Sequence, residues 1–157
     1  MPVAGPEASA SWTIWSSEYA LIAGVYFPPS LSGIEYLYAL SQLSDAISRA
    51  RRTLSLPIVV LGDFNSRLGR NITGDHDQHP RKAATMQFVD QNGLSLLNTL
   101  LRTSEKRWTW LSQRRSDGRI FKSIVDLAMS GGTSSDQLDV MPPPFATPHQ
   151  VVIATLP

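Results

Sequence analysis

The stretch VVLGDFNSRLG, from Val59 to Gly69, carries a β-branched apolar run directly to a carboxylate and a carboxamide, Asp63 and Asn65. An apolar run without polar alternation is typical of a strand that is buried on both faces. The two polar groups at its end have two interpretations. Aspartate and asparagine are favoured in ordinary strand-ending turns, and they also suit a phosphate-processing site at a strand tip.

A helix is predicted directly before this strand. Between residues 34 and 54 apolar side chains recur at spacings of three and four, and arginines gather at the C-terminal end, as is typical of an amphipathic helix. The expected inward positions are Leu37, Leu40, Leu43, Ile47 and Ala50. A helix that leads into a buried strand indicates a layered α/β fold.

The other elements are predicted from apolar runs between turn residues. A β-hairpin is expected over residues 12–27, with its turn at Ser16–Ser17. A short helix is expected over RKAATMQFVDQNG, with Ala84, Phe88 and Val89 inward. Strand-like segments follow in the order LSLLNTL, RWTWLS, IFKSIVDLAMS, QLDVM and HQVVIATL.

Length and composition indicate one globular domain. The chain has 157 residues, of which 42% are hydrophobic and 17% charged, and this argues against disorder. We expect a flexible leader over residues 1–11 and a single domain over 12–157. The absence of cysteine excludes disulfides and thiolate metal sites.

Membrane and secretory functions are not indicated. No apolar run reaches membrane-spanning length, so we expect no membrane partner. The first residues lack the basic and apolar regions of a secretory signal. We therefore expect an intracellular location, with the nucleus as one candidate compartment.

The charge is uneven along the chain. The net charge of +1 argues for no partner, but residues 102–122 carry seven Lys or Arg against two acidic residues, Glu105 and Asp117. With Trp108 and Trp110 interleaved, this stretch suits a hairpin that contacts a nucleic-acid backbone. An ordinary exposed hairpin has the same composition, so both interpretations stay open.

Polar side chains lie at the tips of several expected strands. Tyr26 ends the first long strand, Asp63 ends the buried one, and His149 opens the last. Asp126 interrupts an apolar strand, where a carboxylate is costly unless it is paired, so we expect His149 as its partner. Strand tips are common ligand sites in α/β folds. Taken singly, Tyr26 could be a surface aromatic and His149 an exposed histidine.

The order of these segments resembles that of a known superfamily. VYFPP, VVLGDFN, the pair Thr109–Trp110, IVDLAMS and the terminal TPH occur as they do in the endonuclease/exonuclease/phosphatase superfamily, most closely in the endonuclease domain of non-LTR retrotransposons. The resemblance spans residues 11–156. It implies a layered α/β sandwich of that type, here lacking the N-terminal strand-helix unit, and metal-dependent hydrolysis of phosphodiesters, usually with Mg²⁺.

The resemblance also implies a role for each polar residue. Asp63 corresponds to the residue that orients or deprotonates the attacking water, and Asn65 to its partner, which also contacts the phosphate. Tyr26 matches a tyrosine that hydrogen-bonds a phosphate oxygen. Asp126 and His149 match a pair in which the carboxylate orients the imidazole that faces the scissile phosphate. A carboxylate in that place favours the imidazolium cation, which stabilises developing negative charge.

Two departures concern the metal. The family's metal-binding Glu has no counterpart, because neither Glu7 nor Glu18 lies in the right context. The usual terminal Ser-Asp-His is Thr147-Pro148-His149 here, and a proline side chain cannot coordinate a cation. Because Mg²⁺ needs carboxylate anchors, we expect doubtful metal binding and weak or absent activity, and the metal ligands are unassigned.

Contacts to DNA are expected from three residues of the basic stretch, namely Trp110, Arg114 and Arg115. The segment GDHDQH, residues 74–79, contains carboxylates and imidazoles but meets no spacing rule for a metal site, so we expect a solvated loop.

Three functions follow, in order of preference. The first is a DNA endonuclease of retrotransposon type. The alternative is a non-catalytic remnant that binds a nucleic acid or a protein partner. A phosphatase acting on a lipid or nucleotide headgroup ranks last, because no specific headgroup pocket is indicated. Loss of the family's first strands would also expose a sheet edge, so we expect self-association or a partner chain there.

Overall fold

The structure is a computed structural model that describes residues 10–112, 116–132, 137–144 and 146–155. Its helices, strands and 3₁₀ turns, in chain order, are β1 (Ser11–Ser16), β2 (Leu21–Tyr26), α1 (Gly33–Leu54), β3 (Ile58–Asp63), α2 (Lys82–Gln91), β4 (Ser95–Leu96), η1 (Leu97–Leu101), η2 (Glu105–Arg107), β5 (Trp110–Leu111), β6 (Lys122–Ser123), β7 (Asp126–Gly131), β8 (Gln137–Met141) and β9 (Val151–Thr155).

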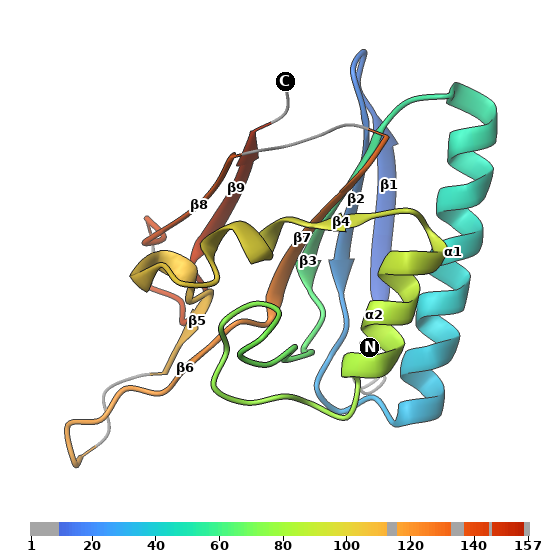
Figure 1. The fold of residues 1–157 in the computed structure, drawn as a ribbon. Coiled ribbons are helices and arrows are strands. Elements are labelled where there is room, and N and C mark those ends of the chain that lie inside the picture. The colour runs from blue at the N-terminus through green and yellow to red at the C-terminus, as the bar shows by residue number, and fades with distance from the viewer. Residues whose placement is uncertain (1–9, 113–115, 133–136, 145, 156–157) are drawn as a thin grey trace, which may run out of the picture.

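A five-stranded mixed sheet forms the centre of the fold, in the order β1-β2-β3-β7-β4. Helices α1 and α2 cover one side of it, and the β8–β9 pair lies on the other (Figure 1). The expected layered α/β sandwich is therefore confirmed.

The sheet combines parallel and antiparallel pairs. β1 and β2 form the expected antiparallel hairpin. β2 and β3 are parallel, because α1 carries the chain back from the end of one to the start of the other. β7 is antiparallel to both β3 and β4. This topology brings the last residues of β2 and β3 and the first residue of β7 together at one end of the strands.

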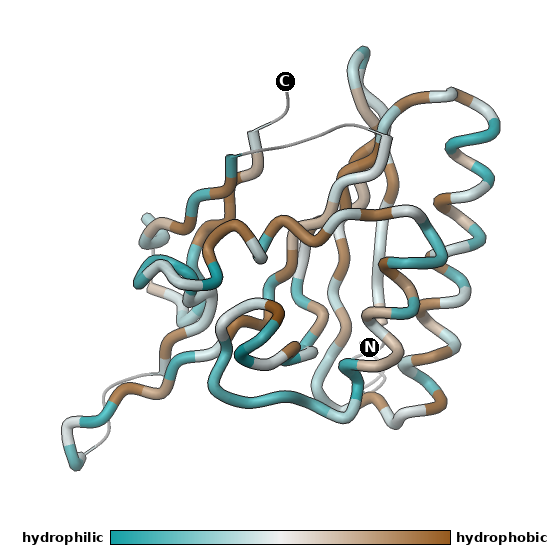
Figure 2. The backbone as a smooth tube through the Cα atoms, viewed as in Figure 1, coloured by the Kyte–Doolittle hydropathy of each residue, from teal (hydrophilic) through white to brown (hydrophobic). Residues whose placement is uncertain are grey.

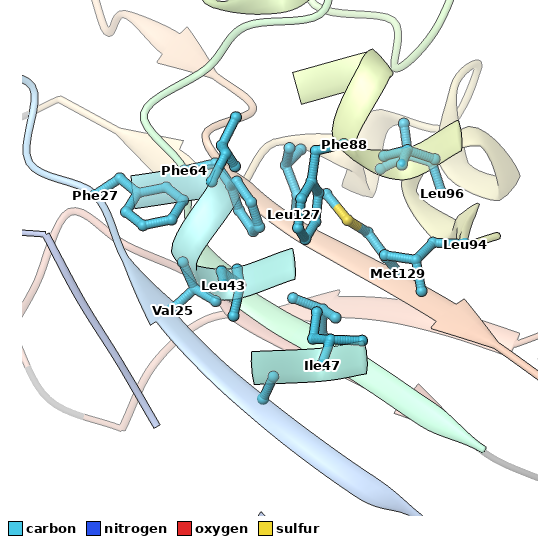
Figure 3. Close-up of a cluster of buried hydrophobic side chains, with 14 of the residues drawn as sticks. Val25, Phe27, Leu43, Ile47, Phe64, Phe88, Leu94, Leu96, Leu127 and Met129 are labelled. Carbon is cyan, nitrogen blue, oxygen red and sulfur yellow. The ribbon is translucent and has the colours of Figure 1, made fainter. Parts of the chain in front are cut away.

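The core lies between the sheet and its helices. Figure 3 shows how strand and helix side chains pack together in this core. Val25 of β2 and Phe27, just after β2, lie against Leu43 and Ile47 of α1 and Phe88 of α2. Burying each such side chain stabilises the fold by roughly 1.5–3 kcal/mol. The loop that leads into α2 is hydrophilic over most of its length (Figure 2). Helix α1 also begins with a capping box, in which the Ser32 and Glu35 side chains each accept a hydrogen bond from the other's backbone N–H.

The predicted inward face of α1 is wrong at one position. Leu37 is 53% exposed, and Tyr36 is fully buried in its place. The Tyr36 hydroxyl lies 2.8 Å from the Thr85 hydroxyl of α2, so this polar group is satisfied inside the core. A phenol with a buried partner competes well with leucine for the interior, which periodicity does not register.

The segment after α2 also differs from the prediction. A strand was expected over residues 94–100, but only Ser95–Leu96 pairs with β7, and η1 follows. The turn is stabilised by Asn98, whose side chain bonds the backbone of β7 at Asp126 and Ala128. Hydrogen bonds from one asparagine side chain thus replace the strand ladder.

Within the described ranges, no helix combines the length and apolar character needed to cross a membrane. The strand β1 lies at one edge of the central sheet. Self-association through such an edge stays a prediction. Of the expected leader, residues 1–9 lie outside the described residues, and Ser11 already belongs to β1.

Gly62 has a close contact that requires glycine. Its φ is 150°, in a region that side chains rarely adopt, and a Cβ built there would lie 1.9 Å from the carbonyl oxygen of Val25 in β2. Because that oxygen belongs to the backbone of the neighbouring strand, it cannot move aside without disturbing the sheet.

We therefore predict that Gly62→Ala destabilises the protein by about 3 kcal/mol or more, which corresponds to a fall in melting temperature of roughly 6–12 °C. Thermal unfolding followed by circular dichroism measures this change. Gly33→Ala is the matched control, because a Cβ there meets no atom within 4 Å, and its melting temperature should stay close to that of the wild type. Equal melting temperatures for the two variants would contradict the role assigned to Gly62.

Candidate functional site

Three of the candidate residues lie in register on neighbouring strands. Tyr26 pairs with Asp63 across the parallel β2–β3 ladder, and Asp63 pairs with Asp126 across the antiparallel β3–β7 ladder. The ends of β2 and β3 and the start of β7 lie together at the lower end of the central sheet in Figure 1. The backbone ladder alone therefore brings a phenol and two carboxylates side by side.

His149 reaches the same place from outside the central sheet. It forms an isolated antiparallel bridge with Trp110. The Leu111 N–H donates to the Pro148 carbonyl at 2.8 Å, and the Gln150 N–H donates to the Thr109 carbonyl at 2.7 Å. These two bonds bracket His149 and fix the start of its segment against the strand that carries Trp110.

The imidazole of His149 lies between the two carboxylates. Nδ1 is 3.0 Å from Oδ2 of Asp126 and 3.2 Å from Oδ1, and Nε2 is 3.9 Å from Oδ2 of Asp63. Since an ionised carboxylate can only accept, Nδ1 carries the proton of the bond to Asp126. The expected Asp126–His149 pair is thus present in the geometry, with Asp63 on the opposite side of the ring.

Asn65 contacts Asp63 through its backbone. The Asn65 N–H donates to Oδ1 of Asp63 at 2.9 Å, whereas the side-chain Nδ2 donates to the carbonyl of Phe27, also at 2.9 Å. Asn65 has φ of 44°, a left-handed conformation that asparagine adopts more readily than most residues. The carboxamide therefore ties the tip of β3 to the end of β2.

The environment of Asp63 shifts its ionisation. Burial raises the pKa of Asp63 from 3.8 to about 6, the hydrogen bond from the Asn65 N–H opposes the shift, the neighbouring carboxylate of Asp126 adds to it, and His149 opposes it. A carboxyl group with a pKa of about 6 is ionised at neutral pH and is basic enough to accept a proton from water.

Two residues that hold Asp126 in place, Thr109 and Asn98, have no signal in the sequence that marks this role. The buried Thr109 hydroxyl accepts hydrogen bonds from the N–H groups of Val125 and Asp126, at 3.0 and 3.1 Å. Asn98 donates from Nδ2 to the Asp126 carbonyl at 3.2 Å and accepts the Ala128 N–H at 2.8 Å. The Thr109–Trp110 pair was recognised only as a segment marker, and nothing in its local pattern indicates a partner 17 residues away.

The expected solvated loop over residues 74–79 is wrong at Asp75. This residue is only 1% exposed. Its carboxylate accepts the Ile124 N–H at 2.7 Å and the Asp77 N–H at 3.1 Å, which anchors the loop to the segment before β7. His76, Asp77 and His79 are exposed, as expected. A buried aspartate is stable here because backbone donors satisfy it.

A cleft of about 340 Å³ lies beside Asp63 and His149. Its lining includes Tyr26, Asp63, Asn65, Trp110 and His149, so the predicted residues of four separate segments share one cavity. The Tyr26 side chain is 42% exposed at the rim. Two further predicted contacts, Arg114 and Arg115, lie outside the described residues.

A second hollow, of about 350 Å³, lies between α1 and α2. The titratable side chain in its lining is that of Asp45, and the rest is serine, glutamine, alanine, leucine and phenylalanine. Because it offers no convergent set of reactive groups, we assign the functional site to the first cleft.

The residues able to hold a divalent cation, among those described, are Asp63, Asp126 and His149, whose ligand atoms lie within 4.8 Å of one another. Two carboxylates meet the minimum that Mg²⁺ takes from a protein when water and substrate phosphate supply its other ligands. Both oxygens of Asp126 already contact His149 Nδ1, so Asp126 would have to share an oxygen between the imidazole and a cation. Pro148 contributes no side-chain ligand, and its carbonyl is bonded to Leu111.

Solved structures with the same fold include nucleases and phosphatases. The endonuclease domain of TRAS1, a telomere-specific non-LTR retrotransposon, has a TM-score of 0.67 at 16% identity, covering 92% of this chain and 63% of that one. The 3′ phosphatase NExo from Neisseria, bound to a product DNA hairpin, has a TM-score of 0.63 at 14% identity, covering 98% and 66%. The mannosyl-6-phosphatase of Bacteroides thetaiotaomicron has a TM-score of 0.61 at 13% identity, covering 94% and 56%.

These identities establish a shared fold only, and the chain spans about 63% of the TRAS1 endonuclease domain. The comparison with curated proteins gave no match. The family comparison is more specific, because the model described as endonuclease-reverse transcriptase matches residues 20–152, which is most of the chain. The chain therefore belongs to this endonuclease-reverse transcriptase family, within the endonuclease/exonuclease/phosphatase superfamily.

Proposed function

We propose that this chain carries part of the catalytic centre of a metal-dependent DNA endonuclease, which hydrolyses phosphodiester bonds. The observation that supports this best is the placement of His149 between Asp126 and Asp63 at the mouth of the cleft. A base, an oriented imidazole and a phenol around one cavity match the needs of attack by water on phosphorus.

Asp63 is the proposed base. In this mechanism it accepts a proton from water as the water oxygen forms a bond to phosphorus, and the ester P–O bond breaks. Its raised pKa, about 6, lets it remain ionised at neutral pH while still accepting a proton. The Asn65 N–H, 2.9 Å from Oδ1, keeps the carboxylate in a single orientation.

His149 is the proposed electrophile. With Nδ1 bonded to Asp126, its Nε2 lies on the side of Asp63 and the cleft, where it can donate to a phosphoryl oxygen or to the leaving oxygen. The Asp126 carboxylate holds the ring in one orientation, so that a hydrogen bond from Nε2 can stabilise the negative charge that develops in the transition state. Tyr26, at the rim, is placed to donate a hydrogen bond to the same phosphate.

The cation would be held by Asp126 together with the substrate phosphate, which leaves Asp63 free to act as the base. When bound, a divalent cation neutralises charge on the phosphate. Mg²⁺ is the proposed ion. The metal site that these residues offer is minimal, so we propose that the chain by itself is a weak enzyme.

DNA is the proposed substrate, in preference to a small headgroup. Trp110 lies on the boundary between the cleft and a larger one of about 580 Å³, whose lining includes Leu111, Pro148 and Gln150. A surface that continues past the reacting phosphate suits an extended chain of nucleotides, and an aromatic ring at the boundary suits stacking on a base.

A second candidate is nucleic-acid binding without cleavage. It is favoured by the engagement of both Asp126 oxygens with His149, which leaves this carboxylate poorly placed to anchor a metal. It shares the DNA contacts of the first proposal and lacks the chemistry, so a cleavage assay separates the two.

We predict that Asp63→Asn and His149→Ala each reduce the nicking of supercoiled plasmid DNA in Mg²⁺ by about 10²–10⁴-fold, the usual contribution of a general acid or base. Excess chelator should abolish the activity of the wild type. Agarose gels of plasmid conversion over time measure these rates.

Asp90→Asn is the matched control, because Asp90 is an exposed carboxylate near the C-terminal end of α2. The chain after α2 leads into β4, which pairs with the end of β7 that is remote from Asp126. It should nick at the wild-type rate. Undiminished nicking in chelator, or in Asp63→Asn, would rule out the proposed mechanism. A wild-type chain that binds DNA and leaves it intact in Mg²⁺ and in Mn²⁺ would establish the second candidate instead.

The raised pKa of Asp63 predicts opposite effects of pH on rate and stability. The rate should rise about tenfold per pH unit below pH 6 and level off above about pH 7, as the carboxylate form accumulates. Because the folded-state value of about 6 exceeds the ordinary 3.8, the contribution of Asp63 to stability is full below about pH 4 and is lost as pH rises through 6.

Asp63→Asn should consequently raise the melting temperature at pH 7.5, by an amount equivalent to about 2 kcal/mol, and should change it little at pH 4. Differential scanning fluorimetry at both pH values, with Asp90→Asn alongside, measures the difference. A variant that is destabilised equally at both pH values would show that burial of the Asp63 carboxylate does not reduce stability at neutral pH.

A further inference from the structure

We propose that Arg67 is a phosphate-binding residue of the cleft and that Asp77 occupies its guanidinium until DNA displaces it; this inference rests on the proposed function. Arg67 lies two residues after Asn65 and lines the cleft that holds Asp63 and His149. Its Nη1 lies 3.0 Å from Oδ2 of Asp77. Neither residue belongs to the sequence segments that carry the resemblance to the superfamily.

The charge balance of the cleft calls for such a cation. Asp63 lines it directly, and Asp126 lies on the opposite side of the His149 ring. A phosphodiester that approaches two carboxylates is repelled unless positive charge compensates. Among the described residues of the lining, Arg67 carries the permanent positive charge, and its planar fork matches two phosphate oxygens at once.

The ion pair is weak enough to exchange. The Arg67 and Asp77 side chains are 39% and 69% exposed, and exposed pairs of this kind contribute little to stability because water screens them. A phosphate offers the same guanidinium a charge-assisted bidentate contact inside a cleft, which is stronger. DNA therefore competes with Asp77 on favourable terms.

The backbones of both residues are held by hydrogen bonds, whereas their side chains are partly exposed. The Arg67 carbonyl accepts the His79 N–H at 2.8 Å, and Leu68 and Gln78 form an antiparallel bridge. The Asp77 N–H is bonded to the buried carboxylate of Asp75. Exchange of partners thus requires rotation of one arginine side chain and no movement of the loop.

The experiment measures binding of a short fluorescein-labelled DNA duplex in chelator, where the DNA stays intact, by fluorescence anisotropy at several salt concentrations. We expect Arg67→Ala to weaken binding about tenfold and to reduce the slope of log K against log salt by roughly 0.7–0.9. Asp77→Asn should strengthen binding about two- to fivefold, because it removes the competitor. The double variant should match Arg67→Ala, since Asp77 acts through Arg67.

Arg52→Ala is the matched control for charge. Arg52 is exposed near the C-terminal end of α1, where the chain leads into the start of β3, at the opposite edge of the sheet from Asp63. Its binding should equal that of the wild type, and thermal melts confirm that each variant is folded. Unchanged binding in Arg67→Ala, or weaker binding in Asp77→Asn, would overturn the inference. If Arg67→Ala weakens DNA binding and Asp77→Asn strengthens it, but the wild type does not nick DNA in Mg²⁺, the proposed enzyme is refuted and the inference about Arg67 stands.

Discussion

The backbone ladder at the carboxyl end of β3 is the constraint on which the site depends. Its last residue is paired on both sides, with Tyr26 of β2 and Asp126 of β7, and the bonds continue one step further, from Phe27 N–H to the Asp63 carbonyl and from Phe64 N–H to the Val125 carbonyl. A slip of one residue in either ladder would turn Asp63 to the other face. Gly62 makes this ladder possible, because only a residue without Cβ allows β2 to approach so closely.

Burial makes Asp63 useful and costly at once. A carboxylate that is removed from water has a raised affinity for a proton, and the same desolvation reduces the stability of the fold at neutral pH. The surrounding core, which includes Phe27, Tyr36 and Met129, offsets this cost through contacts between side chains that carry no charge at neutral pH. Reactive and stabilising residues therefore occupy neighbouring layers and have different physical tasks.

Much of the fold and part of the site could be predicted from the sequence, for identifiable reasons. The strand over Ile58–Asp63 and the helix over Gly33–Leu54 have strong local patterns, and the polar tips follow from them. Thr109, Asn98 and Asp75 act through hydrogen bonds to backbone groups far along the chain, which leave no periodic signal. Leu37 was misplaced because Tyr36 finds a partner on α2. Such choices are made by tertiary packing.

His149 is held in the site by fewer backbone hydrogen bonds than the two carboxylates are. Asp63 and Asp126 belong to central strands, whereas the imidazole depends on a two-bond bracket to the short strand of Trp110 and on its contact with Asp126. Short peripheral ladders open at a lower free energy than central ones. The carboxylates should thus persist through local openings that carry the imidazole away, so that Asp63 and Asp126 would for that time face the cleft without the ring between them.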